Sequence, residues 1–64
     1  MIEYQVYSRN NGEKQYKISS YLIKIHEPLE IGKFTTYKQF GLTRAKIDKI
    51  EFKNIYKVYL TIFS

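Results

Sequence analysis

Apolar and polar side chains alternate almost without interruption from residue 44 to residue 63. Such a period of two places successive side chains on opposite faces of a β-strand. A three-residue loop at 53–55 would give three cross-strand pairs, Phe52 with Tyr56, Glu51 with Lys57 and Ile50 with Val58. Apolar side chains then face apolar ones and opposite charges meet, as cross-strand energetics favour. The run therefore predicts an antiparallel strand pair.

The phase of this alternation slips once. The apolar positions are odd-numbered up to Ile47 and even-numbered from Ile50 onward. The match with the last strand is kept if Asp48 and Lys49 together oppose Tyr59, which is the geometry of a β-bulge. The next pairs are then Ile47 with Leu60 and Ala45 with Ile62. Because bulges bend strands, the slip predicts a curved sheet.

Residues 2–9 also alternate, with Ile2, Tyr4 and Val6 on one face and Glu3, Gln5 and Tyr7 on the other. The run ends at Asn10-Asn11-Gly12, and glycine in the third position of a three-residue loop accepts the left-handed conformation that such a loop needs. This loop predicts a hairpin with the pairs Arg9 with Glu13, Val6 with Tyr16 and Tyr4 with Ile18.

The second strand of that hairpin changes phase as well, because Tyr16 and Ile18 are even-numbered whereas Tyr21, Ile23 and Ile25 are odd-numbered. One extra residue at Ser19-Ser20 explains the change and predicts a second bulge. The strand ends near Pro28, since proline cannot donate to a central ladder. A third strand is expected around residues 33–38, after Gly32.

The composition favours strands, with seven tyrosines and four phenylalanines in 64 residues. A chain of this length forms one domain with a small core. We expect a single all-β domain over residues 1–64, a small five-stranded curved sheet or SH3-like barrel built from two hairpins and a middle strand.

The pattern Gly41-x-x-x-Ala45-x-Ile47-x-x-Ile50, followed by an aromatic-rich strand, resembles the SH3-like barrels of the KOW type. In that family a glycine precedes a strand of the form small-x-aliphatic-x-x-aliphatic. The chain departs from the family at Ala45, where the motif has a second glycine. The resemblance spans residues 41–62 and implies the fold, together with a tendency to bind nucleic acid or the translation and transcription machinery.

Residues 36–50 have an alternative helical interpretation, a helix-turn-helix within an α+β fold, with Gly41 in the turn and Thr43 as N-cap. Arg44 and Lys46 would then begin a recognition helix and DNA would be the partner. Acidic residues are preferred in a first helical turn, and this disfavours the helix.

The net charge of +5 lies entirely in the second half of the chain. Four basic and four acidic residues cancel before residue 31, whereas seven basic residues after it face only Asp48 and Glu51. This asymmetry is typical of a site for an anionic partner, either nucleic acid or an acidic protein surface. The alternative is a lysine-rich solvated surface that keeps a small β protein soluble.

Groups for catalysis are few. The chain has no cysteine and one histidine, His26. Glu27 and Glu30 lie near it in the sequence, but a metal site would need a second histidine or a cysteine to complete it. The three glycines are too far apart to form a phosphate loop. We expect no enzymatic activity, no metal and no cofactor.

The absence of cysteine fits a reducing compartment, so we expect a cytoplasmic protein. We expect no signal peptide and no membrane span either, since the longest apolar runs are far too short.

The predicted site is the outer side of the last strand pair. Its residues are Arg44, Lys46, Lys49, Lys57 and Tyr59, extended by Lys33 and Lys38. Cations beside an exposed aromatic ring suit single-stranded nucleic acid, because lysine and arginine contact phosphates while the ring stacks on a base. In a competing interpretation Tyr59 and Phe63 cover a second core layer and the lysines are only solvated.

Three functions follow. The first is a nucleic-acid-binding module that uses this basic face. The second is a protein-interaction module, such as the small inhibitors that phages and mobile elements direct against host nucleases or polymerases. The third is a homodimer that extends its sheet through residues 56–63, which carry apolar side chains on both faces.

Overall fold

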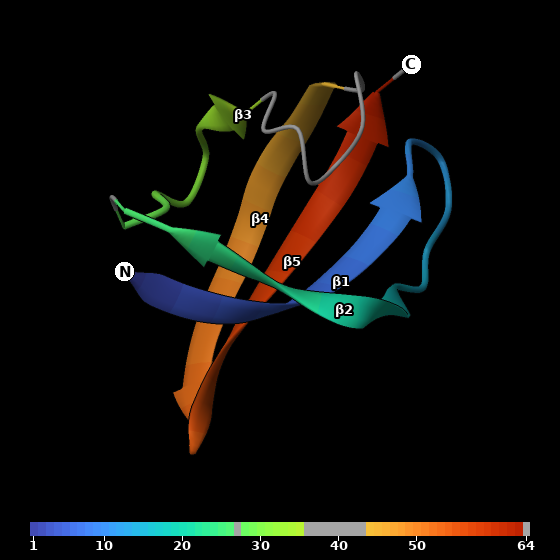
Figure 1. The fold of residues 1–64 in the computed structure, drawn as a ribbon. Helices are drawn as coiled ribbons and strands as arrows, with labels where there is room; N and C mark the ends of the chain where they lie inside the picture. Colours follow the sequence, from blue (N-terminus) through green and yellow to red (C-terminus); the bar gives the residue numbers. More distant parts are fainter. Residues whose placement is uncertain (27, 36–43, 64) are drawn as a thin grey trace.

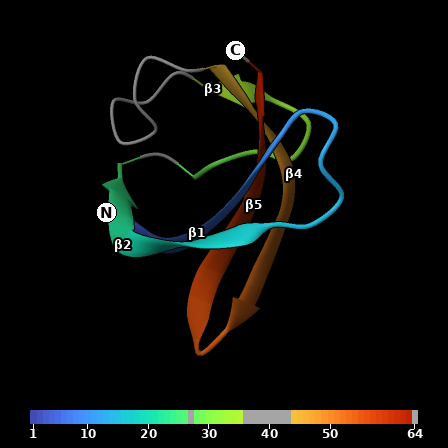
Figure 2. The same cartoon turned by 90° about the vertical axis from the view of Figure 1, so that its right-hand side faces the viewer.

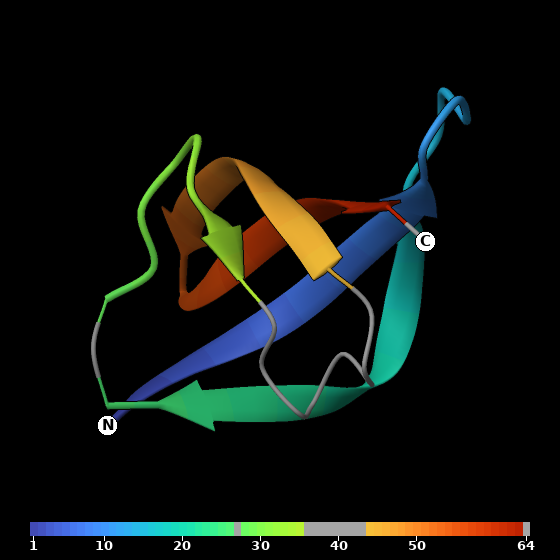
Figure 3. The same ribbon diagram turned by 90° about the horizontal axis from the view of Figure 1, so that it is seen from above.

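The computed structural model describes residues 1–26, 28–35 and 44–63, and these form a single mixed β-sheet (Figure 1). The strands are β1 (Ile2–Asn10), β2 (Lys17–Ile25), β3 (Phe34–Thr35), β4 (Arg44–Lys53) and β5 (Ile55–Phe63). Their order across the sheet is β2-β1-β5-β4-β3. The sheet is coiled rather than flat (Figures 2 and 3). The prediction of a small, curved all-β fold is therefore confirmed.

Strands β4 and β5 pair in the register that the alternation predicts, including Ile50 with Val58 and Ile47 with Leu60. The turn is tighter than expected, because Lys53 pairs with Ile55 and only Asn54 lies between the strands. Asn54 has a φ of 69°, a left-handed conformation that asparagine accepts more readily than most residues.

The bulge in β4 is also confirmed, because the register shifts between Ile47 and Lys49 and leaves Asp48 as the extra residue. Ala45 and Ile47 are buried before the bulge, and Ile50 packs against the same core after it. The bulge thus keeps the apolar side of β4 turned inward while the strand bends (Figure 2).

Strands β1 and β5, from opposite ends of the chain, lie side by side at the centre of the sheet and run parallel (Figure 1). Their register runs from Tyr4 with Tyr56 to Asn10 with Ile62. Since β5 is hydrogen-bonded to β1 on one side and to β4 on the other, it has no free edge. The predicted sheet extension of a homodimer through residues 56–63 is therefore wrong.

The predicted register of the first hairpin is wrong. Ser8 pairs with Lys17 and Tyr7 with Ile18, so the connection between β1 and β2 is six residues long instead of three. The reason is a long-range hydrogen bond: the Asn11 amide donates to the Ile62 carbonyl at 2.9 Å and continues the ladder between β1 and β5. Gly12 does adopt the expected left-handed conformation, with a φ of 98°.

The register of β2 against β1 shifts near Ser19-Ser20 as expected, between Gln5 and Tyr7, but β2 gains two residues there instead of the predicted one, because Gln5 pairs with Leu22 and Tyr7 with Ile18 (Figure 3). Gln5 Nε2 donates to the Ser19 carbonyl there, at 2.9 Å. The expected cause is wrong, however. Ile18 is 62% exposed and does not belong to the core, so the apolar side chains before and after the bulge do not share a face.

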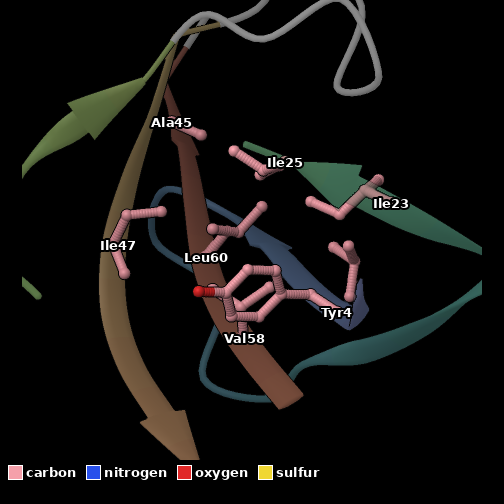
Figure 4. Close-up of a cluster of buried hydrophobic side chains, with 8 residues drawn as sticks. Tyr4, Ile23, Ile25, Ala45, Ile47, Val58 and Leu60 are labelled. Atoms are coloured by element: carbon pink, nitrogen blue, oxygen red, sulfur yellow. The ribbon is translucent and has the colours of Figure 1, made fainter. Parts of the chain in front are cut away.

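The core lies on one side of the sheet and is built by four strands (Figure 4). Its buried members are Tyr4, Val6, Ile23, Ile25, Ala45, Ile47, Val58 and Leu60. Tyr4 is the only one of these eight residues with a polar side-chain atom, and its hydroxyl accepts a hydrogen bond from the Leu29 amide at 3.2 Å. That bond fastens the segment after β2 over the core.

Strand β3 is shorter in the described residues than the expected 33–38, and residues 36–38 lie outside them. The Gly32 amide donates to the Ile47 carbonyl at 2.7 Å, and the Ile47 amide donates to the Lys33 carbonyl at 2.9 Å. The helix-turn-helix alternative is wrong for residues 44–50, which belong to β4. Its first helix, at 36–43, falls outside the described residues.

Candidate nucleic-acid interface

The side of the sheet turned away from the core carries most of the predicted site, and we call it the outer face. Because Val58 and Leu60 point into the core, the alternate positions of β5 point outward. The registers of the neighbouring strands extend this face across β1, β4 and β3. Its residues include Gln5, Tyr7, Arg9, Phe34, Arg44, Lys46, Asp48, Lys49, Glu51, Lys57, Tyr59, Thr61 and Phe63.

Three tyrosines form a cluster on this face, which we call the tyrosine cluster. Tyr7 and Tyr59 are register partners on β1 and β5, and their rings stack with centroids 4.8 Å apart and planes 19° from parallel. Tyr16 meets Tyr59 edge-on, at 5.2 Å and 76°. All three are half-buried. Tyr59 thus packs against other tyrosines on the outside of the sheet and leaves part of its ring accessible.

Each ring of the tyrosine cluster has a cation over it. Lys49 Nζ lies 5.1 Å from the Tyr59 centroid, and Lys57 Nζ lies 5.9 Å from that of Tyr7. The Arg9 guanidinium lies 4.5 Å from the third ring, that of Tyr16. A cation at such a distance is attracted to the ring face by about 0.5–1 kcal/mol at an exposed site. The cations are therefore held beside the rings.

The bulge residue Asp48 accepts two hydrogen bonds on one oxygen, Oδ2. The Tyr16 hydroxyl donates to it at 2.8 Å, and the Thr61 hydroxyl donates as well. Arg9 Nε donates to Thr61 Oγ1 at 2.9 Å, and its Nη2 lies 3.8 Å from the same carboxylate oxygen. Burial and the hydrogen bond to Asp48 raise the pKa of Tyr16, so its hydroxyl stays protonated as the donor.

Asp48→Ala is expected to destabilise the fold by about 1–3 kcal/mol, because it leaves the Tyr16 and Thr61 hydroxyls without their acceptor. The free energy of unfolding from urea titration measures this loss. Glu3→Ala is the matched control, since Glu3 pairs with Lys24 at the surface and its removal should cost less than about 1 kcal/mol. Equal losses for the two variants would show that the Asp48 network does not stabilise the fold.

Two phenylalanines form a second aromatic group on the outer face, the phenylalanine cluster. Phe34 on β3 and Phe63 on β5 have ring centroids 5.7 Å apart. The Arg44 guanidinium lies over the Phe34 ring, 4.1 Å from its centroid. Phe34 is 48% exposed, and Arg44 is exposed too. The cluster therefore presents an aromatic ring and a guanidinium to solvent.

Carboxylates offset only some of the cations. Lys49 pairs with Glu51 at 3.5 Å, and a hydrogen bond from the Tyr59 hydroxyl, with the nearby lysine charge, lowers the pKa of Glu51 and keeps it ionised. Arg9 is similarly engaged by the bulge carboxylate. Within the described ranges, the ion pairs do not include three outer-face cations, Arg44, Lys46 and Lys57. Arg44 and Lys46 supply uncompensated positive charge, whereas Lys57 faces Glu51 across β4 and β5 and is partly offset by it.

The structure brings together five of the seven predicted site residues, Arg44, Lys46, Lys49, Lys57 and Tyr59. Lys33 does not join them, since it lines a hollow of about 130 Å³ with Leu29 and Ile47, on the core side of the sheet. Lys38 lies outside the described residues.

Sequence reasoning missed Tyr7, Arg9, Tyr16 and Phe34 as members of the site. The outward phase of Tyr7 in the first strand was a signal, but it gained meaning only from the pairing of β1 with β5. Nothing in the local pattern around Tyr16 indicates Asp48, which is 32 residues away in the sequence.

A different surface lies at the tip of the β4–β5 hairpin, which projects beyond the rest of the sheet (Figures 1 and 2). Phe52 is 65% exposed there, and its ring packs against Tyr56 at 4.7 Å. Ile55 and Met1 are also exposed. These residues border an open groove of about 320 Å³. The tip is therefore an apolar surface, separate from the cations of the outer face.

In the ranges that the structure describes, acidic and histidine side chains do not gather in threes as a metal site requires. The same ranges contain no helix with the length and hydropathy to cross a membrane. Comparisons with protein-family models, with curated proteins and with solved structures found no match.

Proposed function

We propose that this protein is a non-enzymatic module that binds nucleic acid through the outer face. The observation that carries the proposal is the coincidence of two features on one side of the sheet. The cations Arg44, Lys46 and Lys57, which belong to no ion pair among the described residues, lie on the same face as the stacked rings of Tyr7 and Tyr59. A solvating surface needs charge but has no need of aromatic rings beside it.

In this proposal the cations contact phosphates and release counterions, which supplies most of the affinity. The aromatic rings add contacts to bases, and such contacts are worth about 1–3 kcal/mol each. The sheet holds both sets of groups in place, because β5 is hydrogen-bonded to β1 on one side and to β4 on the other.

The test is the binding of a labelled oligonucleotide at several salt concentrations, followed by fluorescence anisotropy. Three phosphate contacts to a single strand predict that log K falls with log salt at a slope of about −2, since each contact contributes about −0.7. Heparin serves as the comparison, because it is a polyanion without bases. The proposal is wrong if no oligonucleotide binds saturably at low salt, or if heparin binds as tightly.

The apolar hairpin tip favours a second candidate, a protein-interaction module such as an inhibitor of a nucleic-acid enzyme. Exposed aromatic side chains such as Phe52 and Tyr56 are typical of residues that dominate protein–protein interfaces. This candidate predicts that a partner protein from a nuclease-treated lysate is lost with Phe52→Ser and retained with Lys57→Ser. Nucleic-acid binding through the outer face predicts instead that Lys57→Ser weakens the binding of an oligonucleotide and that Phe52→Ser does not.

A further inference from the structure

The outer face carries two aromatic groups, and the distance between them constrains the ligand. The tyrosine cluster is centred on Tyr59, and the phenylalanine cluster includes Phe63 four residues further along β5. At roughly 3.3 Å per residue of strand, the two positions are about 13 Å apart. Both clusters lie on the same side of the sheet because their positions on β5 are both odd-numbered.

A cation lies between the clusters. Lys46 is the register partner of Thr61 on β5 and of Phe34 on β3, and it is half-buried. Thr61 itself is buried and hydrogen-bonded to Arg9 and Asp48, so it presents no free polar group to a ligand. The order along the face is therefore ring, cation, ring.

Only a single-stranded nucleic acid can contact both rings and the cation between them through its bases and its backbone. In a duplex each base face is covered by the next base, and a protein reaches only base edges and phosphates. A single strand can turn bases out of the stack and lay them on aromatic rings or on an arginine guanidinium plane. Aromatic rings at two positions on a basic face thus favour a single-stranded ligand, whose bases can stack on them, over a duplex.

We propose that the outer face binds a single strand that places one base at each cluster and passes its backbone over Lys46. The inference rests on the proposed function and specifies its ligand. Nucleotides in a stacked strand are about 3.4 Å apart, so a gap of about 13 Å spans about four steps, and the footprint, counted with the base at each end, is about five nucleotides.

The side chains over the rings can make room for these bases. Lys49 lies over the Tyr59 ring with most of its own surface exposed, so a base can take its place while the ammonium moves to a phosphate. Arg44 stays on Phe34 and offers the outer side of its guanidinium plane. The two clusters therefore receive bases in different ways, one on a ring and one on a stacked guanidinium.

The experiment compares single-stranded oligothymidylates of two to eight nucleotides with a duplex of the longest length, at one low salt concentration. Affinity is expected to rise steeply up to about five nucleotides and more slowly beyond. Phe34→Leu removes one aromatic ring without changing charge, and it should weaken binding of the eight-nucleotide strand by about 5- to 150-fold. The two-nucleotide strand is too short to reach both clusters and should lose much less.

Phe52→Leu is the matched control, because it makes the same substitution at an exposed phenylalanine on the hairpin tip, and it should leave affinity unchanged. Arg44→Lys is a second variant that keeps the charge and the fold but removes the guanidinium plane, and it should weaken the long strand as Phe34→Leu does. Circular dichroism establishes that each variant is folded.

The possible outcomes separate the inference from the function on which it rests. If the duplex binds as tightly as the single strand, or if neither Phe34→Leu nor Arg44→Lys changes affinity, the two-cluster inference is wrong and the proposed function stands. If no oligonucleotide of either form binds saturably, both are wrong. Selective single-strand binding with a loss in both variants supports both.

Discussion

Leu60→Ala is expected to unfold a large fraction of the protein. Leu60 is 0% exposed and lies on the central strand β5, where it pairs with Ile47 across the sheet (Figure 4). Truncating a buried leucine costs about 2–5 kcal/mol, through lost burial and the cavity left behind. A chain of this size has a total stability of roughly 3–10 kcal/mol, at about 0.05–0.15 kcal/mol per residue. One substitution therefore removes much of the margin.

Urea denaturation followed by circular dichroism measures this effect. Leu22→Ala is the matched control, because Leu22 lies on the edge strand β2 and is 45% exposed, so its loss should be within about 0.5 kcal/mol. A core centred on β5 requires the Leu60 variant to lose several times more stability than the Leu22 variant. Similar midpoints for the two variants would contradict the packing described above.

The double variant Lys46→Glu/Lys57→Glu is expected to abolish measurable nucleic-acid binding. Neither lysine belongs to an ion pair of the described ranges, and Lys57, although it faces Glu51 in the register, keeps its ammonium over the Tyr7 ring. Two unit charges at contact interact by about 1 kcal/mol in water, so each reversal changes binding by about 2 kcal/mol. The double variant should then bind roughly a thousand-fold more weakly at low salt, and the salt slope should become shallower by about 1.4.

Lys17→Glu/Lys24→Glu is the control for this experiment, because it makes the same change in net charge with two exposed lysines of β2. If binding depends on the outer face, the control retains most of its affinity. Equal losses in the two double variants would mean that net charge alone attracts the nucleic acid, and the outer face would then have no special role.

Much of the β4–β5 hairpin could be predicted from the sequence, because its information is local. The alternation, its slip at Asp48 and the pairing of Glu51 with Lys57 involve residues that are close along the chain. A one-residue shift would turn every apolar side chain to the wrong face, so the pattern admits one register. The position of Arg44, Lys46, Lys49 and Lys57 on one face follows from the same alternation.

The first hairpin could not be predicted in the same way, because its local pattern competes with distant partners. A three-residue loop satisfies Asn10, Asn11 and Gly12 locally, but the Asn11 amide instead bonds to the Ile62 carbonyl. Tyr16, predicted to face Val6, is held by the bulge carboxylate of β4. Both contacts are made with distant residues, so the local alternation of apolar and polar positions does not indicate them.

The sequence by itself determined the strand class, the register of the β4–β5 hairpin and the concentration of positive charge on one side of it, because period-two alternation and charge order act between near neighbours. Only the tertiary structure decided that β1 lies parallel to β5 and brings Tyr7 onto Tyr59. That pairing joins opposite ends of the chain, and it forms because it buries the apolar sides of both strands in one core.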